Sequence, residues 1–190
     1  GGRVLAGMLA HHRPVRPLVL GMAGGGVVVA TEVAAALQGS LYAAVSVPFG
    51  PPDDPDLALG AATADGGAVV EEGLAVRLGL TRADLSPVIR AAAAAAGRRE
   101  GAWGPDPWRR VAGAAVVVVD EGVAGGVRGR AVLARARGAG ARWVTCAVAV
   151  GLPATVDLIA AEVDEIVCPR QPLRFHSTAD WYESFPDIDD

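Results

Sequence analysis

A run of four valines that ends in two adjacent acids, Asp120 and Glu121, constrains the fold more than any other segment. The run, Val116–Val119, is continuously apolar, which is typical of a strand buried on both faces of a parallel sheet. A glycine-bearing loop follows, and the residues after it predict a helix over 126–137. A parallel strand of this kind brings its last side chains and the start of the next helix to the carboxyl edge of the sheet. The segment therefore predicts an acidic pair beside an anion-binding loop, as a phosphorylated sugar or nucleotide would require.

Strands and helices alternate along the rest of the chain, which predicts an α/β fold with right-handed crossovers. We expect further strands at residues 17–22, 41–47, 57–63, 68–71, 142–150 and 165–168. We expect helices at residues 3–12, 27–37, 74–78, 81–99 and 153–161, with Thr81 as the N-cap of the fourth. The predicted architecture is one domain over residues 1–190. It has a mostly parallel, twisted sheet of about five strands flanked by helices, and residues 169–190 form a small C-terminal hood or clasp.

Composition excludes several classes of function. The net charge of −4 argues against nucleic acid as a partner. No apolar run approaches the roughly 18 residues that cross a bilayer, and the first residues do not resemble a signal peptide, so we expect a cytoplasmic protein without a membrane partner. All 17 basic residues are arginines, which rules out Schiff-base or P-loop chemistry that needs a lysine.

Cysteine and histidine usage gives no sign of a metal centre. Cys146 and Cys168 lie in apolar, strand-like segments, where reduced, buried thiols are the expected state. The three histidines, His11, His12 and His176, lack the spacing of metal ligands. We therefore expect no metal to be held by histidine.

Three separated segments of the chain resemble the type I phosphoribosyltransferase family. They are Gly21–Val27, Asp120–Arg128 and the ending Trp181-Tyr182-Glu183-Ser184-Phe185. A bacterial branch of that family reads Gly-x-x-Arg-Gly-Gly-Val, Asp-Asp-Gly-x-Ala-Thr-Gly-x-Thr and Trp-Tyr-x-x-Phe at these places. A fourth segment, Pro55–Ala61, is also similar to that branch, so the likeness extends over nearly the whole chain.

The resemblance implies a ligand, a reaction and a set of site residues. The ligand is 5-phosphoribosyl-1-pyrophosphate with Mg²⁺, and a nitrogen nucleophile displaces the pyrophosphate. Asp120 and Glu121 occupy the places of the catalytic acids that hydrogen-bond the ribose hydroxyls. The implied 5-phosphate loop consists of Gly122, Val123, Ala124, Gly125, Gly126, Val127 and Arg128. The implied pyrophosphate loop contains Ala23, Gly24 and Gly25, and the acceptor hood is formed by Phe175, Trp181 and Tyr182.

Several residues depart from the family pattern. Gly125 and Arg128 replace two threonines of the phosphate loop, and Gly24 replaces the arginine of the pyrophosphate loop. After the next strand, Val47-Pro48 stands where the family has Arg-Lys. The region that should bind pyrophosphate has therefore lost three cations, and each lost donor can cost roughly 3–4 kcal/mol of transition-state stabilisation. Two hypotheses follow: a transferase, or a non-catalytic relative that binds a nucleotide, a phosphosugar or a protein.

Other interpretations stay open at individual positions. Arg128 is either a surface side chain or a substitute phosphate clamp. The acids Asp53, Asp54 and Asp56 belong to a mobile acidic loop or contact Mg²⁺ when that loop closes. The aromatic tail packs as a clasp, forms a homodimer contact or stacks on the acceptor. A dinucleotide site at residues 21–26 is disfavoured, because this turn does not match Gly-x-Gly-x-x-Gly.

Overall fold

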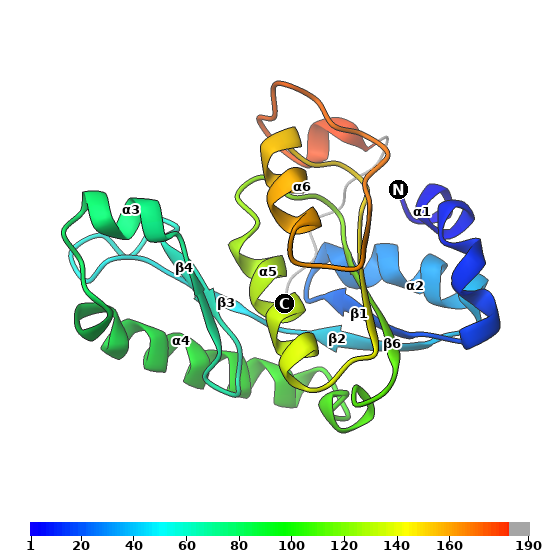
Figure 1. Cartoon of the computed structure of the whole chain (residues 1–190), viewed down its shortest axis with the longest axis horizontal. Coiled ribbons are helices and arrows are strands. Elements are labelled where there is room, and N and C mark those ends of the chain that lie inside the picture. The colour runs from blue at the N-terminus through cyan, green and yellow to red at the C-terminus, as the bar shows by residue number, and fades with distance from the viewer. Residues whose placement is uncertain (183–190) are drawn as a thin grey trace.

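A five-stranded parallel sheet forms the centre of the computed structural model, which describes residues 1–182 (Figure 1). Its strands lie in the order β2-β1-β6-β7-β8. Their bounds are β1 Leu18–Met22, β2 Ser40–Ala44, β6 Ala115–Asp120, β7 Trp143–Val148 and β8 Glu165–Val167. The predicted fold class, an α/β fold with a parallel sheet of about five strands, is confirmed.

Helices cover both faces of this sheet, because successive side chains of a buried strand point to opposite sides. On one face, α1 (Gly2–Met8) and α2 (Gly25–Leu37) pack against Val19, Val117 and Val119. On the other face, α5 (Val127–Gly138) and α6 (Pro153–Ala160) pack against side chains of β1, β6 and β7. The continuous apolar pattern of β6 thus reflects burial on both faces.

A smaller antiparallel sheet lies to one side of the main sheet (Figure 1). It consists of β3 (Val47–Phe49), β4 (Gly60–Ala62) and β5 (Ala68–Val70). It is accompanied by α3 (Glu72–Arg77) and α4 (Arg82–Ala102). Thr81 is the predicted N-cap of α4, and it forms a reciprocal capping box with Asp84. The sequence predicted the hairpin of β4 and β5 but not that β3 would complete a separate sheet.

Two of the predicted elements end earlier than expected, and the chain continues as a different element. The strand expected over residues 41–47 ends at Ala44, and the chain resumes as β3 in the other sheet. Pro48 is tolerated there because β3 is an edge strand. The helix expected over residues 3–12 stops at Met8 and gives way to a 3₁₀ helix, η1 (Ala10–Val15), which contains Pro14.

Two further 3₁₀ turns are η2 (Trp108–Arg110) and η3 (Ala179–Trp181). Among the described helices, none combines the length and the apolar character needed to cross a membrane. The longest, α4, has 21 residues and carries charged side chains along its length.

Candidate functional site

The two predicted glycine loops are neighbours because β1 and β6 are hydrogen-bonded in parallel, with Gly21 opposite Val119. The acids at the end of β6 therefore lie against the first turn of α2. A Cβ atom at Gly26 would be 3.1 Å from Oδ1 of Asp120, and one at Gly25 would be 3.0 Å from Cδ of Glu121. A larger residue at position 25 would push Glu121 aside, and one at position 26 would meet both Met22 and Asp120.

The acidic pair is partly buried and electrostatically strained. Burial, a side-chain hydrogen bond to Glu121 and the Glu121 charge raise the pKa of Asp120 well above its usual range, while the Arg128 charge opposes this rise. Oδ1 of Asp120 accepts the Glu121 backbone N–H at 2.9 Å. Oε2 of Glu121 is buried, and the described residues offer it no hydrogen-bond partner. The pair therefore favours any ligand that supplies a proton donor or a cation.

The loop after the acids is anchored at Val123 and, by a hydrogen bond from Thr155 Oγ1 to its carbonyl, at Ala124, but it leaves its later amides available. Val123 donates its N–H to the carbonyl of Val150 at 2.9 Å, and its carbonyl accepts from the Leu152 N–H at 3.1 Å. In residues 1–182, the amides of residues 124–128 have no acceptor. Gly126 adopts φ 80° immediately before α5. Free amides at the start of a helix form a concavity that can bind an anion.

Arg128 connects this loop with the turn after β1. Its Nη2 donates a hydrogen bond to the carbonyl of Ala23 at 3.2 Å, and its own carbonyl accepts from Ser46 Oγ at 3.0 Å. Its Nε is buried, and no partner for it is found among the described residues. This placement favours the clamp interpretation over the surface interpretation. Ser46 was not predicted, because only the turn of the chain after β2 brings it here.

The backbone at Gly24 favours glycine. Gly24 adopts φ 97° and ψ −139°, a conformation that L-residues rarely reach. An arginine at position 24 would therefore strain the turn as it is built. The cation that approaches this turn comes instead from Arg128, at the start of α5.

The C-terminal tail reaches the acidic pair. The hydroxyl of Tyr182 donates to the carbonyl of Glu121 at 2.7 Å, and a Cβ atom at Gly122 would meet Thr178 at 2.6 Å. Trp181 and Tyr182 line a cavity of about 970 Å³, together with residues of α1, α2 and the segment after β7. Phe175 is partly buried in the same tail, and Phe185 lies outside the described residues.

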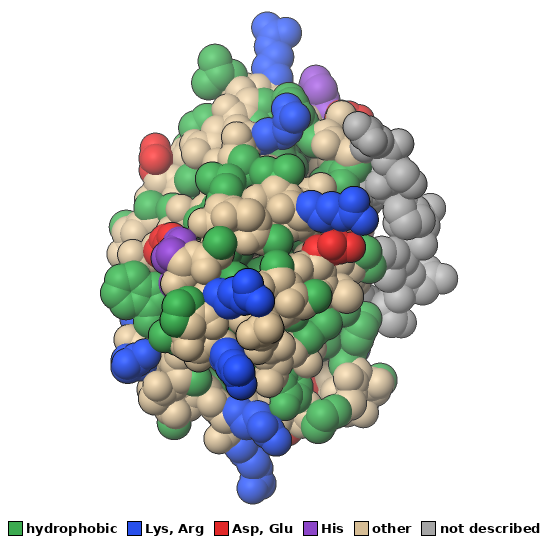
Figure 2. Space-filling model, turned by 90° about the vertical axis from the view of Figure 1, so that its right-hand side faces the viewer, with side chains coloured by type: hydrophobic (Ala, Val, Ile, Leu, Met, Phe, Trp, Pro, Cys, Tyr) green, Lys and Arg blue, Asp and Glu red, His purple; other side chains and the backbone are tan. Residues whose placement is uncertain are grey.

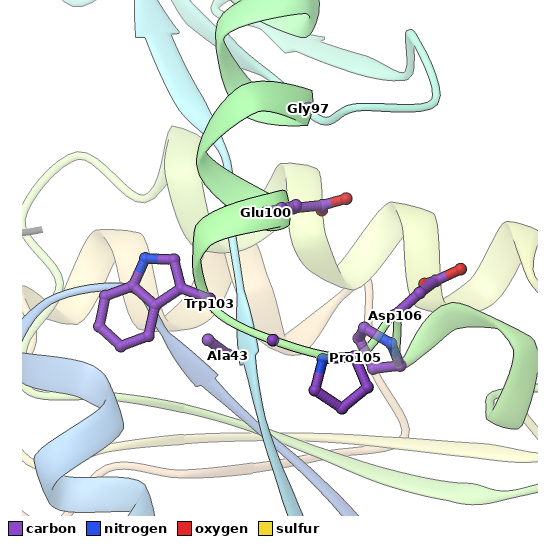
Figure 3. Close-up of a pocket in the computed structure, with 9 residues that line it drawn as sticks. Ala43, Gly97, Glu100, Trp103, Pro105 and Asp106 are labelled. Atoms are coloured by element: carbon purple, nitrogen blue, oxygen red, sulfur yellow. The ribbon is translucent and has the colours of Figure 1, made fainter.

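Two other features lie apart from the acids. Asp53, Asp54 and Asp56 are exposed in the loop between β3 and β4, which fits both interpretations of this loop. A pocket of about 240 Å³ at the end of α4 is lined by residues that include Glu100, Trp103 and Asp106 (Figure 3). None of the predicted site residues lines this pocket, and Glu100 is already hydrogen-bonded to Trp108 Nε1.

Comparisons with known proteins identify relatives along the whole chain. The chain is 34% identical over 195 aligned residues to "Putative phosphoribosyl transferase Rv0571c" of Mycobacterium tuberculosis H37Rv, and equally to its counterpart in strain CDC 1551. The alignment covers 100% of this chain but only 43% of those proteins, so the chain spans less than half the length of these curated relatives. No protein-family model matches the chain.

Solved structures give a second comparison. The crystal structure of TT1426 from Thermus thermophilus superimposes with a TM-score of 0.76 at 32% identity, covering 98% of this chain and 88% of that one. This agreement in sequence and structure extends to nearly all of both chains.

Proposed function

We propose that the chain is a phosphoribosyltransferase-type protein, as the names of its curated relatives suggest, and that it binds a ribose 5-phosphate compound such as phosphoribosyl pyrophosphate. The site is the edge where β1 and β6 end. The observation that supports this most strongly is the direct packing of Asp120 and Glu121 on Gly25 and Gly26. It joins the two loops that the family resemblance assigns to the two ends of one ligand.

The loop at residues 124–128 is suited to the 5-phosphate. Its amides lack acceptors within the described chain, and they stand at the positive end of the α5 dipole. A phosphate would satisfy several of them at once. A Cβ atom added at Gly125 would have no other atom within 4 Å, so this part of the loop is open to a ligand.

The acidic pair is suited to the ribose. A buried carboxylate oxygen without a partner costs roughly 1–3 kcal/mol, and a ribose hydroxyl donated to Glu121 Oε2 would remove that cost. Asp120 and Glu121 also offer the oxygen ligands that Mg²⁺ prefers, so these two side chains would hold the ion the family uses. Bound there, Mg²⁺ would neutralise charge on the pyrophosphate.

The same residues would support transfer of the ribosyl phosphate to a nitrogen nucleophile. A nitrogen nucleophile forms a bond to ribose C1 while the bond from C1 to the pyrophosphate oxygen breaks, and pyrophosphate leaves with the bonding electrons. The carboxylates stabilise the positive charge that develops on the ribose ring. Arg128, beside the turn after β1, supplies the cation for the leaving group. Tyr182, whose hydroxyl donates to the carbonyl of Glu121, is the proposed cover of the acceptor.

A second candidate function is a family member that binds the ligand without transferring it. The observation that favours it is the small number of positively charged side chains near the proposed pyrophosphate turn. Gly24 contributes no side chain, Val47 and Pro48 are uncharged, and the chain contains no lysine. One arginine is left to stabilise a highly charged leaving group, which would slow turnover more than binding.

Calorimetric titration with phosphoribosyl pyrophosphate, with and without Mg²⁺, tests the binding proposal. We expect Mg²⁺-dependent heat from the wild-type chain and none from an Asp120→Asn/Glu121→Gln variant. The matched control is Glu72→Gln/Asp157→Asn, which removes the same charge from exposed positions on α3 and α6. Equal binding by the acid-pair variant, or no heat from the wild type at millimolar ligand, would overturn the proposal. Pyrophosphate release in the presence of nucleobases then separates a transferase from a binding protein.

A further inference from the structure

Two histidines and a glutamate gather at the opposite end of the main sheet. Nε2 of His11 lies 3.1 Å from Oε1 of Glu165, and Nε2 of His12 lies 2.6 Å from Oε2 of the same carboxylate. The three potential ligand atoms all lie within 4.8 Å of one another. The histidines are adjacent in sequence but the glutamate is more than 150 residues away, so spacing alone did not reveal the cluster.

The fold holds each member of the cluster in place. The 3₁₀ helix η1 carries both histidines, whose rings lie 4.2 Å apart. Glu165 is the first residue of β8 and pairs with Thr145 of β7. The buried Thr145 hydroxyl accepts from Trp143 Nε1 at 3.2 Å and donates to Glu165 Oε2 at 3.3 Å. Hydrogen bonds of this kind, made behind the ligand atoms, orient a carboxylate ligand.

The spacing of the ligand atoms suits a small divalent ion. In a tetrahedral zinc site with bonds of about 2.0–2.2 Å, neighbouring ligand atoms lie about 3.3 Å apart. The two distances from His11 Nε2 to the carboxylate oxygens, 3.1 and 3.3 Å, are close to this value. To bind such an ion, the 2.6 Å distance from His12 Nε2 to Glu165 Oε2 would have to lengthen by about 0.7 Å, and the two histidine ligand atoms, which lie within 4.8 Å of each other, would have to settle about 3.3 Å apart. Two imidazoles and a carboxylate are typical ligands of zinc and related transition metals.

Solvent can reach the cluster from one side. The His12 side chain is 10% exposed and that of Glu165 25%, whereas His11 is 56% exposed. Figure 2 views the molecule from the side of α1 and η1 and shows histidine side chains at the surface near acidic ones. An ion therefore has a route to the cluster, and water can complete its coordination on the exposed side.

We propose that His11, His12 and Glu165 form a binding site for a zinc-like divalent transition-metal ion. The ligands are Nε2 of each histidine and the Glu165 carboxylate. The ion would fasten the N-terminal segment to β8 at the edge of the sheet. This site is separate from the acidic pair at the carboxyl edge and does not depend on the proposed ribose-phosphate function.

Titration of tag-free, metal-stripped protein with ZnSO₄ by calorimetry tests this proposal. We expect one ion per chain, and a rise in melting temperature that grows with the zinc concentration. Substituting Co²⁺ for zinc should give visible absorption bands of tetrahedral coordination. His11→Ala and Glu165→Gln should each weaken zinc binding at least tenfold, in line with the loss of one ligand.

His176→Ala is the matched control, because it removes the remaining histidine from an exposed position outside the cluster. His12 is buried, so replacing it would leave a gap in the packing. The exposed His11 is therefore the histidine to replace, and circular dichroism confirms that the variant is folded. Zinc binding that is unchanged in folded His11→Ala and Glu165→Gln would overturn the proposal. So would the absence of zinc binding to the wild type, which would show the cluster to be an ion pair.

Discussion

The guanidinium of Arg128 donates a hydrogen bond across the site to the backbone carbonyl of Ala23, at 3.2 Å. The bond joins the first turn of α5 to the turn that follows β1. A cation thereby lies beside Gly24, whose φ of 97° disfavours any other residue. If this turn binds pyrophosphate, as we propose, Arg128 supplies the positive charge that Gly24 cannot.

Replacing Arg128 with methionine should therefore weaken binding of pyrophosphate and of phosphoribosyl pyrophosphate. A charge-assisted hydrogen bond contributes roughly 1.5–3 kcal/mol, so we expect a loss of about 10- to 100-fold in affinity. Calorimetry with each ligand measures it. Arg137→Met is the control, because Arg137 lies in the same helix and pairs with Asp164. Equal losses in the two variants would contradict a specific role for Arg128.

Gly26→Ala should weaken ligand binding because the new methyl group has no space. Its Cβ would lie 2.8 Å from Met22 Cβ and 3.1 Å from Asp120 Oδ1, so the acid must move. We expect a lower melting temperature together with an affinity loss of at least tenfold. Gly125→Ala, where the Cβ meets open space, should change neither by much. A Gly26→Ala variant with wild-type affinity would show that the position of Asp120 does not matter.

Asp120→Asn should stabilise the folded protein at neutral pH. Because the folded state raises the pKa of Asp120, it holds this proton at pH values where the unfolded chain has released it. The stability of the wild type therefore falls as the pH rises from the unfolded pKa towards the folded pKa. Asparagine removes this penalty, and each unit of the raised pKa corresponds to about 1.4 kcal/mol.

Urea unfolding of both proteins between pH 3 and pH 8 measures this difference. The advantage of Asp120→Asn should be absent at the acid end and grow as the pH increases. A variant that is less stable than the wild type at every pH would show that burial does not penalise the charged Asp120.

Ligand binding with Mg²⁺ should strengthen as the pH rises. A cation binds the ionised acid pair, so a proton that Asp120 retains in the free protein must be released on binding. Calorimetry in buffers of different ionisation enthalpy counts the released protons. We expect a measurable release below the raised pKa of Asp120, and none in Asp120→Asn.

Restoring a threonine at position 125 should improve phosphate binding. Gly125 lies in open space with an ordinary φ, so the side chain fits and adds a hydroxyl donor to the loop. One added hydrogen bond contributes roughly 1 kcal/mol, or a few-fold in affinity. Gly129→Thr, in the first turn of α5 and equally open, is the control. No gain from Gly125→Thr would count against aligning this loop with the family's phosphate loop.

Local patterns were sufficient to predict the main sheet and the edge that carries the acids. The valine run, the glycines after it and the cap at Thr81 each depend on neighbouring residues, so a single sequence reveals them. The change of sheet at Ala44 is different, because it depends on pairing between β3 and β4 across the intervening loop. An apolar strand pattern predicts that a strand is buried, but it does not predict which sheet the strand joins.

The hydrogen bond from Arg128 to Ala23 and the contact between His11 and Glu165 also could not be predicted from the sequence. Both depend on contacts between segments more than 100 residues apart, which no periodicity encodes. Helix spacing places Arg128 on α5, but only the parallel pairing of β1 with β6 places Ala23 beside it.

A crystal structure with ribose 5-phosphate is the most direct measurement of the central claim, that one pocket holds both the ribose and its phosphate. The account predicts phosphate oxygens within about 3 Å of the amides of residues 124–128, and ribose hydroxyls that donate to Asp120 and Glu121. A ligand bound elsewhere on the chain, with these amides and carboxylates left unliganded, would contradict it.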